Sequence, residues 1–263
     1  MPLAIAAAAI LALRPACAQT EAGQDETPAP ADAVATVTIT NLTKGQILTP
    51  AVVFSHSPDT PPLFVPGEPA SLELERLAEL GITSGLSEKF RAEPSVLDVT
   101  RLNQFIRPGS TASAQIRFDA SHRLVSLASM IEITNDGFIA VRGAKVPCDG
   151  PVSLLAGGWD AGSEANSERC PDVPARCPQP TPQGTCAVGP AEGFVHVHAG
   201  IHGCANFPAE VYDWRHPVAR IDIAPDPAAS TEEALQAACS DAPGESPEAA
   251  PGSETTPTPS PAP

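Results

Sequence analysis

The segment 134–168 reads TNDGFIAVRGAKVPCDGPVSLLAGGWDAGSEANSE, and it places an apolar strand pattern between two acidic loops. The first loop is the Asn-Asp-Gly sequence at 135–137, and the second spans residues 160–164. Asn-Asp-Gly and Asp-Ala-Gly are turn sequences, so their carboxylates are expected on loops rather than inside strands. If the chain between them crosses a sheet and returns, both loops lie at the same end of a β-sandwich.

Three carboxylates, those of Asp136, Asp160 and Glu164, would then meet at that end. They would repel one another unless a cation lay between them. Hard oxygen ligands on flexible loops suit Ca²⁺ better than zinc or copper, which prefer imidazole or thiolate. The three residues therefore form a candidate calcium site. The alternative is a pair of solvated acidic turns that bind nothing.

Alternating β-branched residues elsewhere indicate more strands, at 35–41, 51–55, 113–118, 122–130 and 218–223. Ser71 as a cap and Gly81 as a stop predict a helix within 69–81, and a shorter one is expected at 86–92. Residues 229–239 are expected to form one or two helical turns. Strands at about ten-residue spacing predict an all-β fold, an antiparallel β-sandwich with one or two short helices in its connecting loops and disordered termini.

Five longer motifs extend this reading: VTITNLTKGQILTPAVVFSH, LASMIEITNDGFIAVRG, WDAGSEAN, EGFVHVHAGIHG and YDWRHPVARIDI. Together they resemble the spondin N-terminal domain family in its bacterial form, over about Val34 to Ile223. The resemblance implies a C2-like β-sandwich that binds calcium and supports cell adhesion. It also implies that Asp136, Asp160 and Glu164 occupy the family's metal-binding positions, with Glu164 standing where the family carries Asp.

Composition divides the chain into four parts. Residues 1–18 have the apolar run and small-residue cleavage site of a secretory signal peptide. Residues 19–33 form an acidic leader, residues 34–224 the spondin-type sandwich, and residues 225–263 an acidic tail rich in Pro, Ser and Ala. The leader and most of the tail lack the apolar residues of a packed core and are expected to be disordered. The mature protein is therefore expected to be secreted or periplasmic.

The formal charge of −16 is concentrated at the two ends of the chain. Four acids lie in residues 19–33 and seven in residues 224–263; removing these and Arg14 leaves −6 for the rest. No basic stripe is present to replace phosphate counterions, so nucleic acid is excluded as a partner. We expect a monomer with no transmembrane segment in the mature protein.

Six cysteines follow the signal segment, and an even number in an exported chain favours disulfides. They are Cys148, Cys170, Cys177, Cys186, Cys204 and Cys239. At least two of the three between 170 and 186 are expected to pair with each other. Cys239 is expected to tether the tail, with Cys204 as its candidate partner.

The Phe-Val-His-Val-His sequence at 194–198 is a strand pattern that places His196 and His198 on one face, with His202 nearby. Such a trio could ligate copper or zinc. The His-Val-His sequence also resembles a strand of the copper–zinc superoxide dismutases, although the other ligands of that family have no match here. The alternative is three imidazoles that hold loops together through hydrogen bonds.

No nucleophile–base motif is present, so we expect a protein that is not an enzyme. The first hypothesis is an exported, calcium-binding recognition or adhesion module whose partner is a surface or matrix protein or a glycan. The second is a periplasmic copper- or zinc-binding protein that uses the three histidines and has possible redox activity. The third is an envelope domain with a structural role and no ligand.

Overall fold

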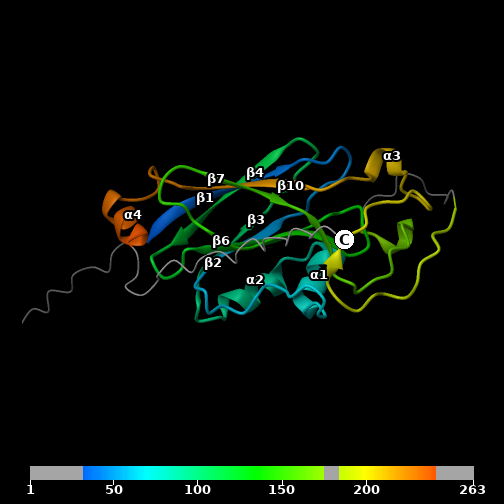
Figure 1. Cartoon of the computed structure of the whole chain (residues 1–263), viewed down its shortest axis with the longest axis horizontal. Coiled ribbons are helices and arrows are strands. Elements are labelled where there is room, and N and C mark those ends of the chain that lie inside the picture. Colours follow the sequence, from blue (N-terminus) through cyan, green and yellow to red (C-terminus); the bar gives the residue numbers. More distant parts are fainter. Residues whose placement is uncertain (1–31, 175–183, 241–263) are drawn as a thin grey trace, which may run out of the picture.

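Two antiparallel sheets lie face to face in the computed structural model, which describes residues 32–174 and 184–240 (Figure 1). One sheet has the strand order β4-β1-β10-β7, and the other β3-β2-β5-β6-β8-β9. The strands are β1 (Ala33–Asn41), β2 (Ala51–His56), β3 (Val96–Leu102), β4 (Thr111–Phe118), β5 (Leu124–Met130), β6 (Gly137–Lys145), β7 (Val152–Ala156), β8 (Gly158–Asp160), β9 (His196–Val197) and β10 (Ala219–Pro225). The helices are α1 (Leu72–Leu80), α2 (Ser84–Arg91), α3 (Ala209–Tyr212), α4 (Glu232–Cys239) and a 3₁₀ turn at Cys170–Asp172.

The predicted antiparallel sandwich is confirmed; α1, α2 and α4 lie where helices or helical turns were expected, and α3 was not expected. The predicted signal segment, nearly all of the leader and the end of the tail lie outside the described residues. Among the described residues, no helix is long and apolar enough to cross a membrane.

β1 shows how the sequence pattern produces the sandwich. Every second residue is buried, so Val37 and Ile39 enter the core while the intervening threonines face outward. Val37 pairs with Ile223 of β10 on one side and with Ala114 of β4 on the other. The strand expected at 35–41 is therefore present, and it lies in the middle of the four-stranded sheet.

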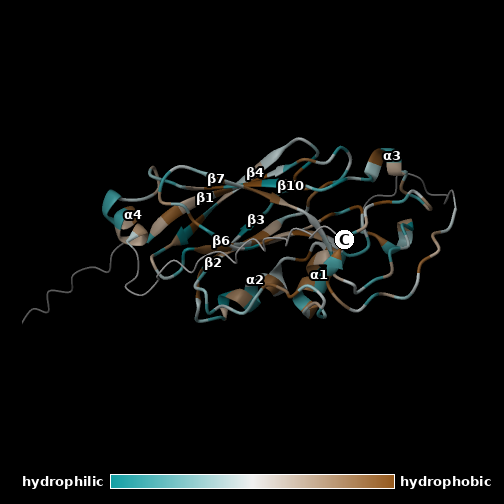
Figure 2. Cartoon of the chain, in the orientation of Figure 1, coloured by the Kyte–Doolittle hydropathy of each residue, from teal (hydrophilic) through white to brown (hydrophobic). Residues whose placement is uncertain are grey.

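β2 differs because all six of its residues are buried. Val53 faces the core between the sheets, whereas Val52 and Phe54 face a second core beneath α1 and α2. The Phe54 ring stacks on Phe90 of α2 with a centroid distance of 3.9 Å. The six-stranded sheet is thus covered on both faces, and the apolar colour of Figure 2 follows its strands and parts of both helices.

α1 begins and ends as the sequence predicts. Ser71 occupies the N-cap position, although its hydroxyl makes no capping hydrogen bond. Gly81 ends the helix in the left-handed conformation, with φ of 66°, which glycine adopts without steric cost. Leu74 and Leu77 point into the second core, so the helix is fixed mainly by its apolar face.

Two disulfides hold the ends of the sandwich. Cys239 in α4 bonds to Cys148, which follows β6, so α4 is tied to the domain. The expected pairing of Cys239 with Cys204 is wrong, because Cys204 bonds to Cys186 instead. α4 lies at one end of the sandwich and α3, which soon follows Cys204, at the other (Figure 1).

The expected pairing among Cys170, Cys177 and Cys186 is tested only in part, because Cys177 lies outside the described residues. Cys170 is itself disulfide-bonded, and Cys186 is bonded outside that segment. Disulfides of this kind form in oxidising compartments and are rare in the cytosol.

His56, at the end of β2, gives the sandwich a predictable pH dependence. Its Nδ1 lies 2.9 Å from the Ser57 carbonyl and its Nε2 2.8 Å from the Ser126 hydroxyl. Burial lowers the pKa of this ring below its usual 6.5. Just below pH 6.5 the imidazole therefore binds a proton in the unfolded chain but stays neutral in the folded protein. We expect the His56 contribution to stability to be complete above about pH 6.5 and to be lost below it, by up to about 1.4 kcal/mol per pH unit.

Urea unfolding between about pH 5 and pH 8 tests this prediction, because the linkage acts only in the part of that range below about pH 6.5. The His56→Gln variant should show a shallower loss of stability on acidification than the natural protein. Parallel curves for the two proteins would contradict it.

Candidate cation site

The two acidic loops meet at one end of the six-stranded sheet. Asp136 immediately precedes β6 and Asp160 ends β8, and these strands are antiparallel neighbours. Gly137 is the register partner of Asp160, so the two carboxylates start from adjacent backbone positions. The backbone N–H of Ala161 also donates to the Asp136 carbonyl, at 3.1 Å. The two predicted loops therefore do lie at the same end.

Asp136 is fully buried, and only one of its carboxylate oxygens is satisfied. Oδ2 accepts hydrogen bonds from the backbone N–H groups of Ser163 and Glu164, at 2.7 and 3.0 Å. Oδ1 has no hydrogen-bond partner. Burial, reinforced by the charge of Asp160, raises the pKa of Asp136 to about 7. A buried carboxylate in this position is stabilised by a proton or by a cation.

Asp160 is also fully buried, but neighbouring groups hold it in place. Its Oδ1 accepts from the Gly162 N–H at 2.8 Å, and its Oδ2 accepts from the Asn166 side-chain amide at 2.7 Å. Both donors come from the loop that follows Asp160 itself. The orientation of this carboxylate is therefore set by its own loop.

Glu164 differs from the other two predicted ligands. Its backbone N–H binds Asp136, but its carboxyl lies among Asn135, Glu79 and Asp172. Burial raises the pKa of Glu164, and the charge of Glu79 raises it further. The structure thus brings Asp136 and Asp160 together, while the Glu164 side chain faces a neighbouring cavity.

His196 and Glu192 complete the cluster around Asp160. The His196 Nε2 lies 3.4 Å from Asp160 Oδ1 and 3.6 Å from Glu192 Oε2. Burial opposes protonation of His196, but the Val197 carbonyl and the two carboxylates outweigh it and raise the pKa of the ring above its usual value. Among the described residues, this is one of two groups that bring three candidate ligand atoms within 4.8 Å of one another.

His198 and His202 do not join that group. The His198 Nδ1 accepts a hydrogen bond from the Gly200 N–H at 3.0 Å, and its Nε2 lies 3.9 Å from Asp160 Oδ2. Burial lowers the pKa of His198 to about 4, so the ring is neutral at neutral pH. His202 lies on an exposed turn. The expected three-histidine arrangement therefore reduces to His196 with two carboxylates.

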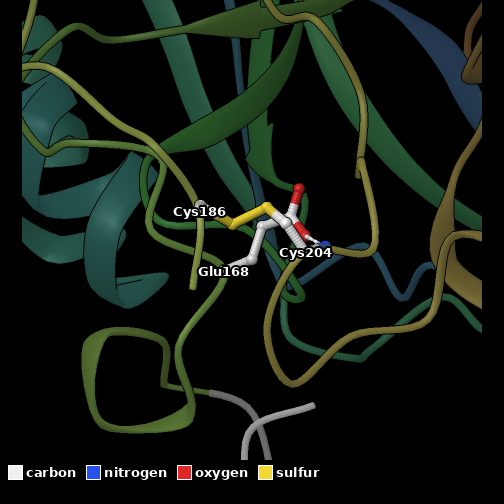
Figure 3. A group of neighbouring side chains, drawn as sticks. All are labelled: Glu168, Cys186 and Cys204. Carbon is white, nitrogen blue, oxygen red and sulfur yellow. Dashed lines mark hydrogen bonds between the residues drawn. A yellow bond between two sulfur atoms is a disulfide. The ribbon is translucent and has the colours of Figure 1, made fainter. Parts of the chain in front are cut away.

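The second group consists of Glu168, Cys186 and Cys204, drawn in Figure 3. The two sulfurs are bonded to each other, so neither is a thiolate ligand. The Glu168 carboxylate accepts backbone hydrogen bonds from His202, Gly203 and Cys204, at 2.5, 2.8 and 3.0 Å. By accepting these three hydrogen bonds, the buried carboxylate holds the 202–204 turn in place, so its role is structural.

Sequence reasoning did not single out Glu192, Asn166 or Glu168. Glu192 precedes His196 by four residues, which on an extended strand would separate them by roughly 13 Å. Gly193, with φ of 78°, turns the chain and returns the Glu192 carboxylate to the imidazole. The sequence signal that could have identified Glu192 is its position directly before Gly193, just before the strand that carries His196.

No protein-family model matches this chain, and no curated protein matches it significantly. The fold and the site themselves define the class: a disulfide-bonded antiparallel β-sandwich with a buried cluster of carboxylates and imidazoles at one end.

Proposed function

We propose that this protein is an exported, non-enzymatic recognition module that binds calcium at the end of its sandwich and uses the loops ordered by the ion to contact its partner. The observation that carries the proposal is Asp136, a fully buried carboxylate with one unpartnered oxygen beside the second buried carboxylate of Asp160. Calcium takes carboxylate and carbonyl oxygens from loops, and the Asp136 and Asp160 carboxylates supply the first kind of donor here.

The partner class follows from the resemblance to spondin N-terminal domains, which implies a surface or matrix protein or a glycan. The disulfides support a location outside the cytosol. The mildly acidic middle of the chain offers no basic surface for nucleic acid. Calcium neutralises Asp136 and Asp160, and thereby stabilises the 160–164 loop that both carboxylates bind.

Calcium should raise the melting temperature of chelator-treated protein. Ligand at 100 times its dissociation constant adds about 2.7 kcal/mol, which for a domain of this size corresponds to about 5–10 °C. The titration extends to the millimolar range, because sites of extracellular modules are weak. Asp136→Asn should abolish this calcium-dependent increment.

Asp149→Asn, a change of the same kind on an exposed loop, is the matched control and should keep the increment. The quantity to compare is the rise in melting temperature on adding calcium, not the melting temperature itself. Asp136→Asn also removes a buried charge, and so it stabilises the ion-free protein. A natural protein that melts at the same temperature with and without calcium would rule the proposal out.

A further inference from the structure

The hydrogen bond at Nδ1 of His196 determines which ring nitrogen carries the hydrogen in the neutral imidazole. Nδ1 lies 3.0 Å from the Val197 carbonyl oxygen, which can only accept, so Nδ1 carries the hydrogen and donates it. In the neutral ring the lone pair is then on Nε2, which has no hydrogen-bond partner. Histidines that bind metals through one nitrogen commonly donate the other N–H to a carbonyl or carboxylate in this way.

That lone pair faces two carboxylate oxygens. Asp160 Oδ1 lies 3.4 Å from Nε2 and Glu192 Oε2 lies 3.6 Å from it, and the three atoms are within 4.8 Å of one another. Three lone-pair donors that converge repel one another unless a positive charge lies among them. A tetrahedral zinc ion with bonds of about 2.0–2.2 Å holds its ligand atoms about 3.3–3.6 Å apart, which matches the distances from His196 Nε2 to Asp160 and to Glu192.

Two further buried polar atoms at this end of the sandwich have no hydrogen-bond partner. His198, with a side chain only 2% exposed, accepts at Nδ1, so its hydrogen is on Nε2, unpartnered and 3.9 Å from Asp160 Oδ2. At 3.9 Å this N–H makes no hydrogen bond to Asp160, and a nitrogen that carries its hydrogen is not itself a ligand. Asp136 Oδ1 is the other unpartnered buried atom at this end.

We propose that His196 Nε2, Asp160 and Glu192 bind a divalent ion of the zinc class, with Asp160 held in place by Gly162 and Asn166. One imidazole and two carboxylates suit zinc, and cobalt as its spectroscopic substitute, better than calcium. Three protein ligands leave a fourth position for a water molecule, and Glu192 and His196 also line a cavity of about 430 Å³.

This ion position does not depend on the calcium proposal. It shares Asp160 with the calcium site but needs neither Asp136 nor Glu164. The competing arrangement is a protonated His196 paired with the two carboxylates, which contains no metal.

Isothermal titration of the chelator-treated full chain with zinc under non-reducing conditions tests the inference. We expect one zinc ion per chain, and a cobalt complex with the intense visible absorption of tetrahedral coordination. Glu192→Gln and His196→Gln should each weaken zinc binding at least about tenfold, since even loss of an outer-shell partner costs that much. His202→Gln should leave the affinity unchanged, which separates this site from a three-histidine one.

Asp136→Asn distinguishes the two cation proposals. It should remove the calcium effect and leave zinc binding intact, whereas Glu192→Gln should do the reverse. Absence of zinc binding, equal zinc affinity in Glu192→Gln and the natural protein, or loss of binding in His202→Gln would each overturn the inference. Glu192 is exposed, so its substitution leaves the fold in place for the measurement.

Discussion

Replacing Glu168 with alanine should lower the free energy of unfolding by about 3–5 kcal/mol. The Glu168 residue is 4% exposed, and its carboxylate accepts the backbone N–H groups of three successive residues, 202–204. Alanine leaves these donors without an acceptor, and an unsatisfied buried donor costs about 1–3 kcal/mol. Water that enters the vacated space recovers part of that cost, which places the expected loss below the sum of three donors.

The backbone of Glu168 strengthens the inference. Its φ of 52° makes it the one non-glycine residue with positive φ among the described residues. Such a conformation costs about 1–2 kcal/mol for a residue with a Cβ and persists only where other contacts impose it. Here those contacts are the carboxylate hydrogen bonds and the Asn206 N–H, which donates to the Glu168 carbonyl at 3.0 Å.

Urea unfolding with the disulfides intact measures the effect. Glu168→Gln, which keeps one acceptor oxygen but turns an amide toward the N–H groups, should fall between alanine and the natural residue. Glu88→Ala, an exposed glutamate on α2, should change stability by no more than about 0.5 kcal/mol. Equal stability of Glu168→Ala and Glu88→Ala would show that the 202–204 turn does not need this carboxylate.

The predictable part of the fold is the part where local pattern and burial agree. β1 alternates cleanly because one face meets the core and the other meets solvent, and α1 has a stop glycine and an apolar stripe. β3 was not predicted, because this edge strand is covered by α2 and alternates poorly, with only Val99 and Leu102 buried. An edge strand of this kind is specified by its neighbours rather than by its own sequence.

The candidate site divides in the same way. The convergence of Asp136 and Asp160 follows from turn sequences at both ends of a strand pair, and it could be predicted. The partnership of His196 with Glu192 depends on a glycine turn, and the exclusion of His198 depends on one backbone N–H, that of Gly200. The spacing of residues along the sequence predicts neither the disulfide partners nor these hydrogen bonds. Both depend on which segments the fold brings together in space.

Replacing Gly162 with alanine should lower the free energy of unfolding by about 2–4 kcal/mol and abolish zinc binding at the proposed position. A Cβ at this position would lie 2.3 Å from the carbonyl oxygen of Phe194 and 2.7 Å from its nitrogen, which are backbone atoms that cannot rotate away. The φ of 69° adds the cost of the left-handed conformation. The 160–164 loop must therefore move away from the segment 193–196.

That movement separates the groups of the proposed ion position. The Gly162 N–H holds Asp160 Oδ1, and the Gly162 carbonyl accepts the Gly193 N–H at 2.8 Å. Gly162 thus joins the carboxylate of Asp160 to the turn that carries Glu192 and His196. Displacing it by even an ångström takes the ligand atoms outside the range over which one zinc ion can bind them.

Gly109→Ala provides the matched control for this variant. Gly109 has a φ of 72°, close to that of Gly162, but its added Cβ would meet nothing within 4 Å. It should lose only about 1–2 kcal/mol through its backbone conformation and should bind zinc as the natural protein does. Because the two variants share the conformational cost, any difference in zinc affinity between them reports the contact of Gly162 with Phe194. Equal affinities would mean that this contact does not position the ligands, and that the cluster around Asp160 is held by its own loop alone.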